Sequence, residues 1–406
     1  MVLISTTQGE TLSIISPGYF NIHGGPDFNQ AQIRLNKMHW AGSVEIHIKS
    51  SDWYSHNHQN DPTYDNIILH VVWEDDIEIC RTNGDLIPTL ILQPIVSSKL
   101  LEKYQCTFQR PYHWIPCEND FNLVPETILT SWKERLFVAR LENKAQRIQD
   151  LLKDTKNDWE ATLFALLARN FGLNVNGDAF FNVARSMDFS IVRKNSSNPF
   201  RLEALFLGQA GLLSCEKEDP YLSKLREEYR FLSNKFGIQP SEERIQFTRL
   251  RPMNFPTIRW VQLAQLYSNH LGLLAKIMNE FPRFDFSWIT KIEVSSFWET
   301  HYSFNKKSHK RKKQISKNML ELIVINTIIP FMFCYFKAHG RDVSEELLDY
   351  ITTLQPEKNG LIKRFGSLHA KIESALDTQA LIELKKQFCD TKKCVNCHIG
   401  AYLLNH

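Results

Sequence analysis

The chain has 406 residues, of which 43% are hydrophobic, so it is long enough for two or three domains with ordinary buried cores. It contains 48 Lys and Arg against 45 Asp and Glu, which gives a formal net charge of only +3. This balance excludes binding of nucleic acid through a general positive field and restricts any such contact to a local patch. Eight cysteines are too few for a disulfide framework in a chain of this length.

The N-terminus reads "MVLISTTQGETLSII" and has no charged segment followed by an apolar one, so we expect a cytoplasmic protein. The run Met319 to Phe336 approaches the length of a membrane span, but it contains Glu321, Asn326 and Pro330. We expect a buried helix of a soluble domain there, and no contact with a membrane.

From Thr11 to about Val96 the patterns predict strands. Residues alternate in "SVEIHIK" (43–49), and β-branched runs occur in "NIILHVVW" (66–73) and "TLILQPIV" (89–96). Turn residues cluster in "HGGPD" (23–27) before these runs and in "TNGD" (82–85) between the last two. The sequence therefore predicts a compact, β-rich N-terminal domain.

After about residue 118 the apolar period becomes helical. One helical stripe is formed by Phe137, Leu141, Ala145, Ile148 and Leu152. Asp158 is a predicted N-cap of the next helix, which we expect to end at Gly172. Further helices are predicted over 202–214, 219–236, 257–280, 318–338, 344–354 and 376–389. We therefore expect an α+β protein with a small domain over 1–118 and a large all-α domain over 119–406.

The strand 43–49 carries an ordered set of polar side chains. Val44, Ile46 and Ile48 point to one face, and Glu45, His47 and Lys49 point to the other. Side chains that alternate on one face stand about 6.5 to 7 Å apart, so neighbours can share a metal ion and a substrate. The alternative is that these three residues form the ordinary solvent face of a half-buried strand.

Asp27 follows a Gly-Gly-Pro turn, and residues 28–40 can form the hairpin partner that brings it beside Glu45. Two adjacent carboxylates repel each other, and a divalent cation between them removes that repulsion. Such a cation lowers the pKa of a bound water and neutralises charge on a phosphate. The pair therefore indicates hydrolysis of phosphodiesters.

These residues carry a resemblance. "PD", about eighteen residues, and then "E-x-H" with a lysine two further on resembles the PD-(D/E)xK motif of restriction-endonuclease-like nucleases. The resemblance implies a restriction-endonuclease-like α/β domain in which Asp27 and Glu45 bind Mg²⁺ or Mn²⁺. His47 stands where that family usually has lysine, so His47, or Lys49 on the same face, would assist the attacking water.

A second group of possible ligands follows the strand. His56, His58 and Asp61 have a spacing that suits Zn²⁺ or Mn²⁺, since imidazole and carboxylate both bind such ions. This group supports a different hypothesis, a zinc hydrolase centred on these three residues. The plain alternative is an exposed loop with histidines that bind no metal.

"RLRPMNFPTIRW" places Arg249, Arg251 and Arg259 around two prolines. Forked guanidinium groups on a proline-fixed backbone suit recognition of phosphate, so these arginines are candidates for binding nucleic acid. The alternative is a buried loop in which they pair with helix carboxylates or with helix C-termini.

Near the C-terminus, Cys389, Cys394 and Cys397 have four and two residues between them. Thiolates at this spacing bind Zn²⁺ or an iron–sulfur cluster. Three cysteines leave one ligand to be found, and Cys117 and Cys334 are better candidates than the adjacent His398. The alternative is a set of reduced cysteines at a cytosolic helix end.

Over nearly its whole length the chain resembles domain-of-unknown-function family 2851. Segments such as "PGYFNIHGGPDFNQAQI" and "WAGSVEIHIKSSDWYSHNHQNDPTYDNIILHVVW" carry this resemblance, which implies no activity. The hypothesis from the residues is a metal-dependent nuclease that acts on nucleic acid, with DNA preferred. A non-enzymatic nucleic-acid-binding or scaffold protein is the alternative, and the sequence leaves the oligomeric state open.

Overall fold

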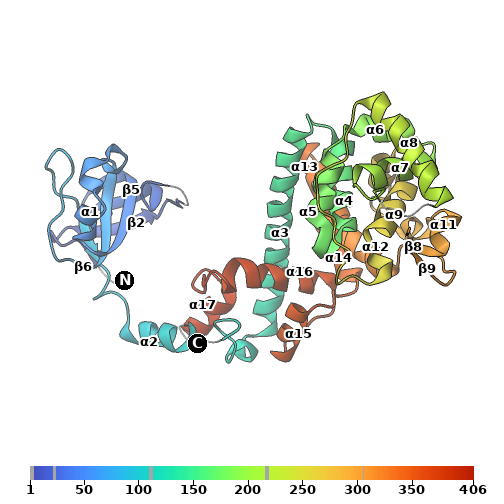
Figure 1. Ribbon diagram of the computed structural model, residues 1–406. Coiled ribbons are helices and arrows are strands. Elements are labelled where there is room, and N and C mark those ends of the chain that lie inside the picture. Colours follow the sequence, from blue (N-terminus) through green and yellow to red (C-terminus); the bar gives the residue numbers. More distant parts are fainter. Residues whose placement is uncertain (1–3, 22–23, 109–112, 215–218, 305) are drawn as a thin grey trace. The chain divides into compact units, whose positions relative to one another are not determined.

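The computed structural model describes residues 4–21, 24–108, 113–214, 219–304 and 306–406 (Figure 1). The chain divides into two compact units, residues 1–112 and residues 113–406. The first is built around a β-sheet and the second is mainly helical, so the predicted α+β class is confirmed. Residues 113–118, which the sequence assigned to the first domain, belong to the second unit.

The first unit contains one mixed sheet with the strand order β1-β2-β4-β5-β6-β7 and with β3 paired to β4. Strands β2, β4 and β5 are antiparallel, whereas β5, β6 and β7 run parallel. Their bounds are Ile4–Ser5 (β1), Thr11–Ser16 (β2), Tyr19–Phe20 (β3), Phe28–Leu35 (β4), Met38–Lys49 (β5), Ile67–Glu74 (β6) and Thr89–Ile91 (β7). The third predicted strand stops early because Pro94 has no N–H for a strand ladder.

A tight hairpin joins β4 to β5, with its turn at residues 36–37 inside the range 28–40 that the sequence assigned to one strand. Leu35 pairs with Met38, and Asn36 between them has a left-handed φ of 54°. At the other end of the ladder Phe28 pairs with Val44, so the backbone places Asp27 beside Glu45.

The crossover from β5 to β6 covers one face of the sheet. It contains the short helix α1 (Asp52–Ser55) and two 3-10 turns, η1 (His58–Asn60) and η2 (Pro62–Tyr64). Trp53 and Tyr64 pack there in an apolar cluster with Ile67, Ile79 and Ile87. The residues of β5 alternate as predicted, but this cover inverts their burial. Glu45 is 6% exposed, whereas Ile46 and Ile48 are 41% and 71% exposed.

The second unit is helical around one large apolar core. A small hairpin, β8 (His301–Ser303) with β9 (Lys306–Lys307), is added to it. Its helices are α3 (Glu126–Asp154), α4 (Trp159–Phe171), α5 (Leu173–Arg185), α6 (Phe189–Asn195), α7 (Pro199–Gln209), α8 (Pro220–Phe236), α9 (Pro256–Asn269), α10 (Leu273–Asn279), α11 (Ser296–Glu299), α12 (Lys317–Ile323), α13 (Ile329–Ala338), α14 (Ser344–Thr353), α15 (Gly360–Ser367), α16 (Ala375–Leu384) and α17 (His398–Asn405). Helix α2 (Ser98–Phe108) belongs to the first unit.

Several helix predictions are confirmed in detail. The Asp158 carboxylate accepts the Ala161 N–H at 3.0 Å and caps α4, and the Gly172 position ends that helix. The predicted helix over 257–280 is interrupted, because Gly272 adopts a left-handed φ of 74° between α9 and α10. In α3 the buried stripe ends on Leu151 rather than on Leu152.

The apolar run near residue 330 forms a continuous helical segment, Lys317–Ala338. Its length and hydropathy would suffice for a membrane span, and 67% of its most apolar window is buried inside the unit. Ile323, Ile328 and Phe331 belong to the helical core. The segment therefore packs as the buried helix that its polar residues predicted.

Candidate metal centre

Glu45 lies at the centre of the polar face of β5. One carboxylate oxygen, Oε2, accepts the backbone N–H of Asp27 at 3.0 Å. The other oxygen, Oε1, is 3.5 Å from Nε2 of His47 and 3.5 Å from Nε2 of His58. The carboxylate is thus buried with one oxygen satisfied and the second facing two imidazoles.

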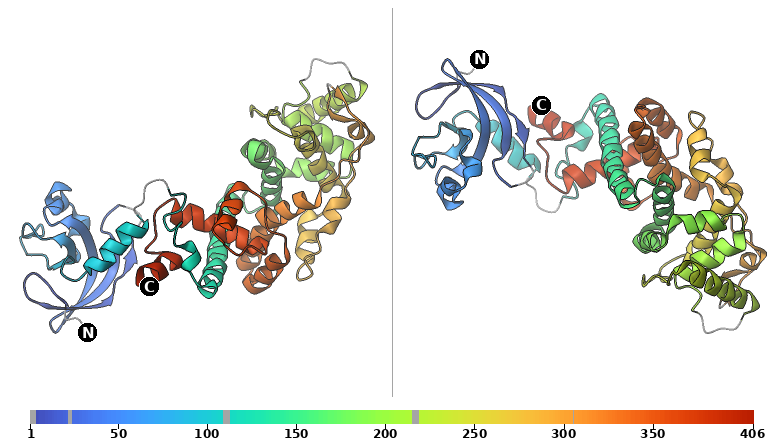
Figure 2. Two further views of the ribbon diagram at one scale, coloured as in Figure 1. Left: turned by 90° about the horizontal axis from the view of Figure 1, so that it is seen from below. Right: turned by 90° about the horizontal axis from the view of Figure 1, so that it is seen from above.

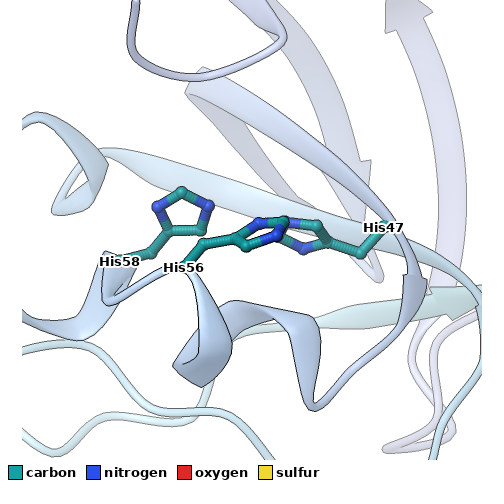
Figure 3. Close-up of side chains that lie close together, drawn as sticks. All are labelled: His47, His56 and His58. Carbon is teal, nitrogen blue, oxygen red and sulfur yellow. The ribbon is translucent and has the colours of Figure 1, made fainter.

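Three imidazoles converge next to this oxygen. His47, His56 and His58 each offer a nitrogen, and these nitrogens all lie within 4.8 Å of one another (Figure 3). His47 Nε2 and His56 Nδ1 are 3.1 Å apart. Asn57 makes the convergence possible, because its left-handed φ of 60° reverses the chain between His56 and His58. His56 is exposed, so this side of the cluster is open to solvent.

A fourth histidine holds His47 from behind. His70 is fully buried on β6, pairs in register with Glu45, and places its Nε2 2.8 Å from His47 Nδ1. Trp53 packs edge-on against the ring of His70 at 5.7 Å. If His47 Nδ1–H donates to His70, the lone pair of His47 Nε2 faces the cluster, which is the usual arrangement behind a metal-binding histidine.

Burial dominates the electrostatics of the group. It raises the pKa of Glu45 to about 7, with the Asp27 carboxylate adding to the rise. It lowers the pKa of His47 to about 4 and that of His70 to about 3, and it also lowers the pKa of His58. The imidazoles of His47, His58 and His70 are therefore neutral at pH 7, which is the form that binds metals.

Two predicted residues do not join the group. The Lys49 ammonium lies 3.5 Å from the Glu74 carboxylate at the exposed end of the strand. Asp61 accepts the N–H and the hydroxyl of Thr63 at 2.9 and 2.8 Å, so it caps the turn η2. Both bonds end on Oδ1, and the charge of Asp61 acts on His58, but the structure does not place its carboxylate among the converging nitrogens.

Asp27 borders the group. Its Oδ2 accepts the Ile46 N–H at 3.0 Å, and its charge acts on both His47 and His58. Among the described residues, its second oxygen accepts no hydrogen bond. The two sites predicted from the sequence, Asp27 with Glu45 and His56 with His58, are therefore parts of one site. His47 joins them, and His70 supports it.

The predicted arginine cluster is divided by burial. Arg259 is only 7% exposed and donates to the side chains of Gln262 and Asn254 at 2.8 and 2.6 Å. Burial lowers its pKa to about 10. Arg249 and Arg251 are exposed. We therefore remove Arg259 from the candidates for direct contact with nucleic acid and keep the other two.

The structure also distinguishes the two candidates for the fourth thiol ligand by where they lie. Cys334 lies in the helical core and donates from Sγ to the Ala145 carbonyl at 3.6 Å. Cys117 lies close enough to Cys389, Cys394 and Cys397 to interact with them electrostatically. His398 contacts Arg135 at 2.8 Å instead of the thiols.

Replacing His70 tests its supporting role. We expect His70→Gln to weaken metal binding at the histidine group by about 10- to 100-fold, because His47 loses the partner that orients its ring. Titration of the metal-free protein with Mn²⁺ in a calorimeter measures the loss. His39→Gln, an exposed histidine on β5, is the matched control and should bind as the unmodified chain does. Equal affinities for both variants would contradict the assignment.

Comparison with known proteins supports the family resemblance. A family model described as "Protein of unknown function (DUF2851)" matches residues 2–360. The match includes the histidine group and Cys117 and ends before Cys389. No curated protein and no solved structure matches the chain.

Proposed function

The chain belongs to the DUF2851 family of proteins of unknown function, and we propose that it is a metal-dependent hydrolase of phosphodiester bonds in nucleic acid, with DNA as the expected substrate. One observation carries the proposal. A buried carboxylate, Glu45, lies 3.5 Å from the nitrogens of His47 and His58, and these two imidazoles converge with that of His56. No lysine or arginine among the described residues forms an ion pair with Glu45.

The spacing of these atoms suits a single cation. Ligand atoms bound about 2.0 to 2.1 Å from one ion stand about 3.0 Å apart in an octahedron and about 3.4 Å apart in a tetrahedron. The contacts of His47 with His56 and Glu45, and of His58 with Glu45, are 3.1, 3.5 and 3.5 Å. A bound cation would also remove the cost of burying the ionised Glu45.

The ligand types narrow the choice of metal. Mg²⁺ prefers oxygen ligands, so three imidazoles favour a first-row transition ion over the Mg²⁺ that the sequence motif also allowed. Four protein ligands would fill a tetrahedral Zn²⁺ site, whereas a six-coordinate ion keeps two positions for water and phosphate. We therefore propose Mn²⁺ as the ion that supports cleavage.

The residues have distinct roles in this proposal. Glu45, His47, His56 and His58 bind the ion, which when bound would lower the pKa of a water and neutralise phosphate charge. His70 orients His47, and Asp27 positions Glu45 through its backbone N–H. The second oxygen of Asp27 would accept the proton of the attacking water. Exposed Arg249 and Arg251 are candidates for salt-sensitive phosphate contacts.

A cleavage assay tests the proposal. The full chain, stripped with a chelator, is incubated with supercoiled plasmid and with a single-stranded oligonucleotide, with Mn²⁺, Mg²⁺ or Zn²⁺ added. We expect cleavage with Mn²⁺, weaker or no cleavage with Mg²⁺, and none with chelator. Salt-dependent DNA binding without cleavage under any of these ions would instead support the non-enzymatic alternative.

A zinc hydrolase with another substrate is the second candidate, and the nitrogen-rich ligand set favours it. Its centre would be Glu45, His47, His56 and His58, without the Asp61 that the sequence suggested. Zn²⁺-dependent hydrolysis of a small ester or peptide, with no cleavage of nucleic acid, would favour this candidate. A cytoplasmic location without membrane contact stays a prediction for both candidates.

A further inference from the structure

Four cysteines lie in two segments, from the two ends of the helical unit, that pack against each other. Cys117 precedes α3, and the other three lie between the end of α16 and the start of α17. Burial and the thiols of Cys397 and Cys394 raise the pKa of Cys117 to about 12. Burial and the thiols of Cys117, Cys397 and Cys394 likewise raise the pKa of Cys389. Each terminal segment thus brings its thiols within electrostatic range of the other.

Contacts with aromatic rings hold the two segments together independently of the thiols. The Lys385 ammonium stands 5.5 Å over the ring of Trp114, three residues before Cys117. On the other side, Trp132 of α3 stacks on His398 at 4.2 Å and contacts Phe388 at 5.2 Å. Both partners of Trp132 are sequence neighbours of cysteines. Helix α17 lies beside the start of α3 in the views of Figures 1 and 2.

N–H groups close to the Cys397 sulfur stabilise its thiolate, although burial raises the pKa of the thiol overall. Cys397 is the N-cap residue of α17, and the N–H groups of Gly400 and Ile399 lower the pKa of its thiol against the larger effect of burial. The buried indole N–H of Trp132 has no hydrogen-bond partner of normal geometry, yet it lies near enough to lower that pKa too. N–H groups directed at sulfur are typical of thiolate-bound metals.

Gly400 shows how closely the chain folds at this point. A Cβ at position 400 would lie 2.0 Å from the Cys394 carbonyl oxygen, so only glycine permits this approach. The Cys397 N–H also donates to that carbonyl at 3.2 Å, which closes a tight turn between the two cysteines. The two cysteines therefore stand at the ends of one tight turn, which is the spacing at which thiolates share a metal ion.

We propose that Cys117, Cys389, Cys394 and Cys397 form a closed four-thiolate centre that binds a zinc ion or an iron–sulfur cluster. The thiols give up their protons to solvent on binding, so four Cys–metal bonds replace four S–H bonds. Cys117 supplies the ligand that the C-terminal motif lacks. All four positions are protein thiolates, so the centre is structural, and its role does not depend on the function of the histidine group.

The proposal assigns the centre a mechanical role. It connects residues 113–124, which lead into α3, with the last helix of the chain. Both segments bury apolar side chains, among them Ile115, Phe121 and Ile399. A metal that binds the folded thiolates but not the unfolded chain stabilises the contact between the segments further by mass action. Loss of the metal should therefore loosen α17 and the residues around Cys117 before the rest of the unit.

Metal analysis of matched variants tests the proposal. The full chain is purified without oxygen in a Glu45→Gln, His56→Ala background, so that metal counted by mass spectrometry belongs to the cysteines. We expect about one zinc, or the iron and sulfide of one cluster, per chain. Cys117→Ser should lower this content at least tenfold, whereas Cys334→Ser, a buried cysteine outside the group, should retain it.

A second measurement does not depend on whether the cysteine variants fold. X-ray absorption at the zinc or iron edge of the same purified background chain should show sulfur ligands at about 2.3 Å, with four for zinc. Zinc and iron edges distinguish the two kinds of centre, and both support the proposal. Absence of stoichiometric metal, disulfides among the four cysteines, or full metal content in Cys117→Ser would overturn it.

Discussion

Glu45→Gln should lower Mn²⁺-dependent cleavage of DNA by on the order of a thousandfold. Glutamine keeps the size of the side chain and can still accept the Asp27 N–H, but it removes the negative charge at the centre of the histidine group. A metal ion contributes several kcal/mol to the stabilisation of the transition state, and each 1.36 kcal/mol changes the rate tenfold. Single-turnover cleavage of a labelled oligonucleotide measures the effect.

The control for this variant is Glu74→Gln. Glu74 lies on the neighbouring strand β6 and pairs with Lys49, but its side chain is half exposed and outside the group. The Glu74→Gln variant should cleave DNA at the rate of the unmodified chain. If Glu45→Gln keeps full activity while calorimetry shows that it has lost Mn²⁺ binding, the histidine group is a metal site without a role in cleavage, and the proposed function fails.

Much of the N-terminal site could be predicted from the sequence because it depends on local rules. The alternation of 43–49 gives the face of Glu45 and His47, and a hairpin partner over 28–40 was expected to place Asp27 beside Glu45, although the turn at Asn36 inside that range was not foreseen. Both are properties of adjacent strands. The capped start of α4 at Asp158 is local in the same sense.

The burial of the site could not be predicted in this way. A strand with Ile46 and Ile48 on one face indicates that this face is covered, but the crossover packs Trp53 over the opposite face. The union of His47 with His56 and His58 depends on one left-handed residue, Asn57. The supporting role of His70 is visible only from the register of β5 and β6, which pairs His70 with Glu45.

Contacts between residues far apart in the sequence were the hardest part of the structure to predict. Cys117 and Cys389 are far apart in sequence, and the sequence offered Cys334 as an equal candidate. Only the helical packing separates them, because Cys334 faces the apolar core between helices. Arg259 shows the same limit, since its helix α9 is buried almost throughout and takes the guanidinium with it.

The pKa of Glu45 leads to a prediction about the metal-free protein. Its folded-state pKa is raised from 4.5 to about 7, so between these values the folded state binds more protons than the unfolded state. Stability therefore falls as pH rises through this window, and the cost is complete above pH 7. His47 and His70, with lowered pKa values, act in the opposite sense below about pH 6.5. Comparison with Glu45→Gln isolates the glutamate.

We expect metal-free Glu45→Gln to be more stable than the unmodified chain at pH 8, by at most about 3 kcal/mol, and nearly equal to it at pH 5. Hydrogen exchange of the β5 and β6 peptides, measured on the full chain with chelator, should then be slower in the variant at pH 8. Mn²⁺ at 1,000 times its dissociation constant should reverse the order, because binding then adds about 4.1 kcal/mol to the stability of the unmodified chain. Glu74→Gln should follow the unmodified chain throughout. A variant with no extra protection at pH 8 would show that the buried carboxylate is compensated without metal, and the case for a cation beside Glu45 would lose its electrostatic basis.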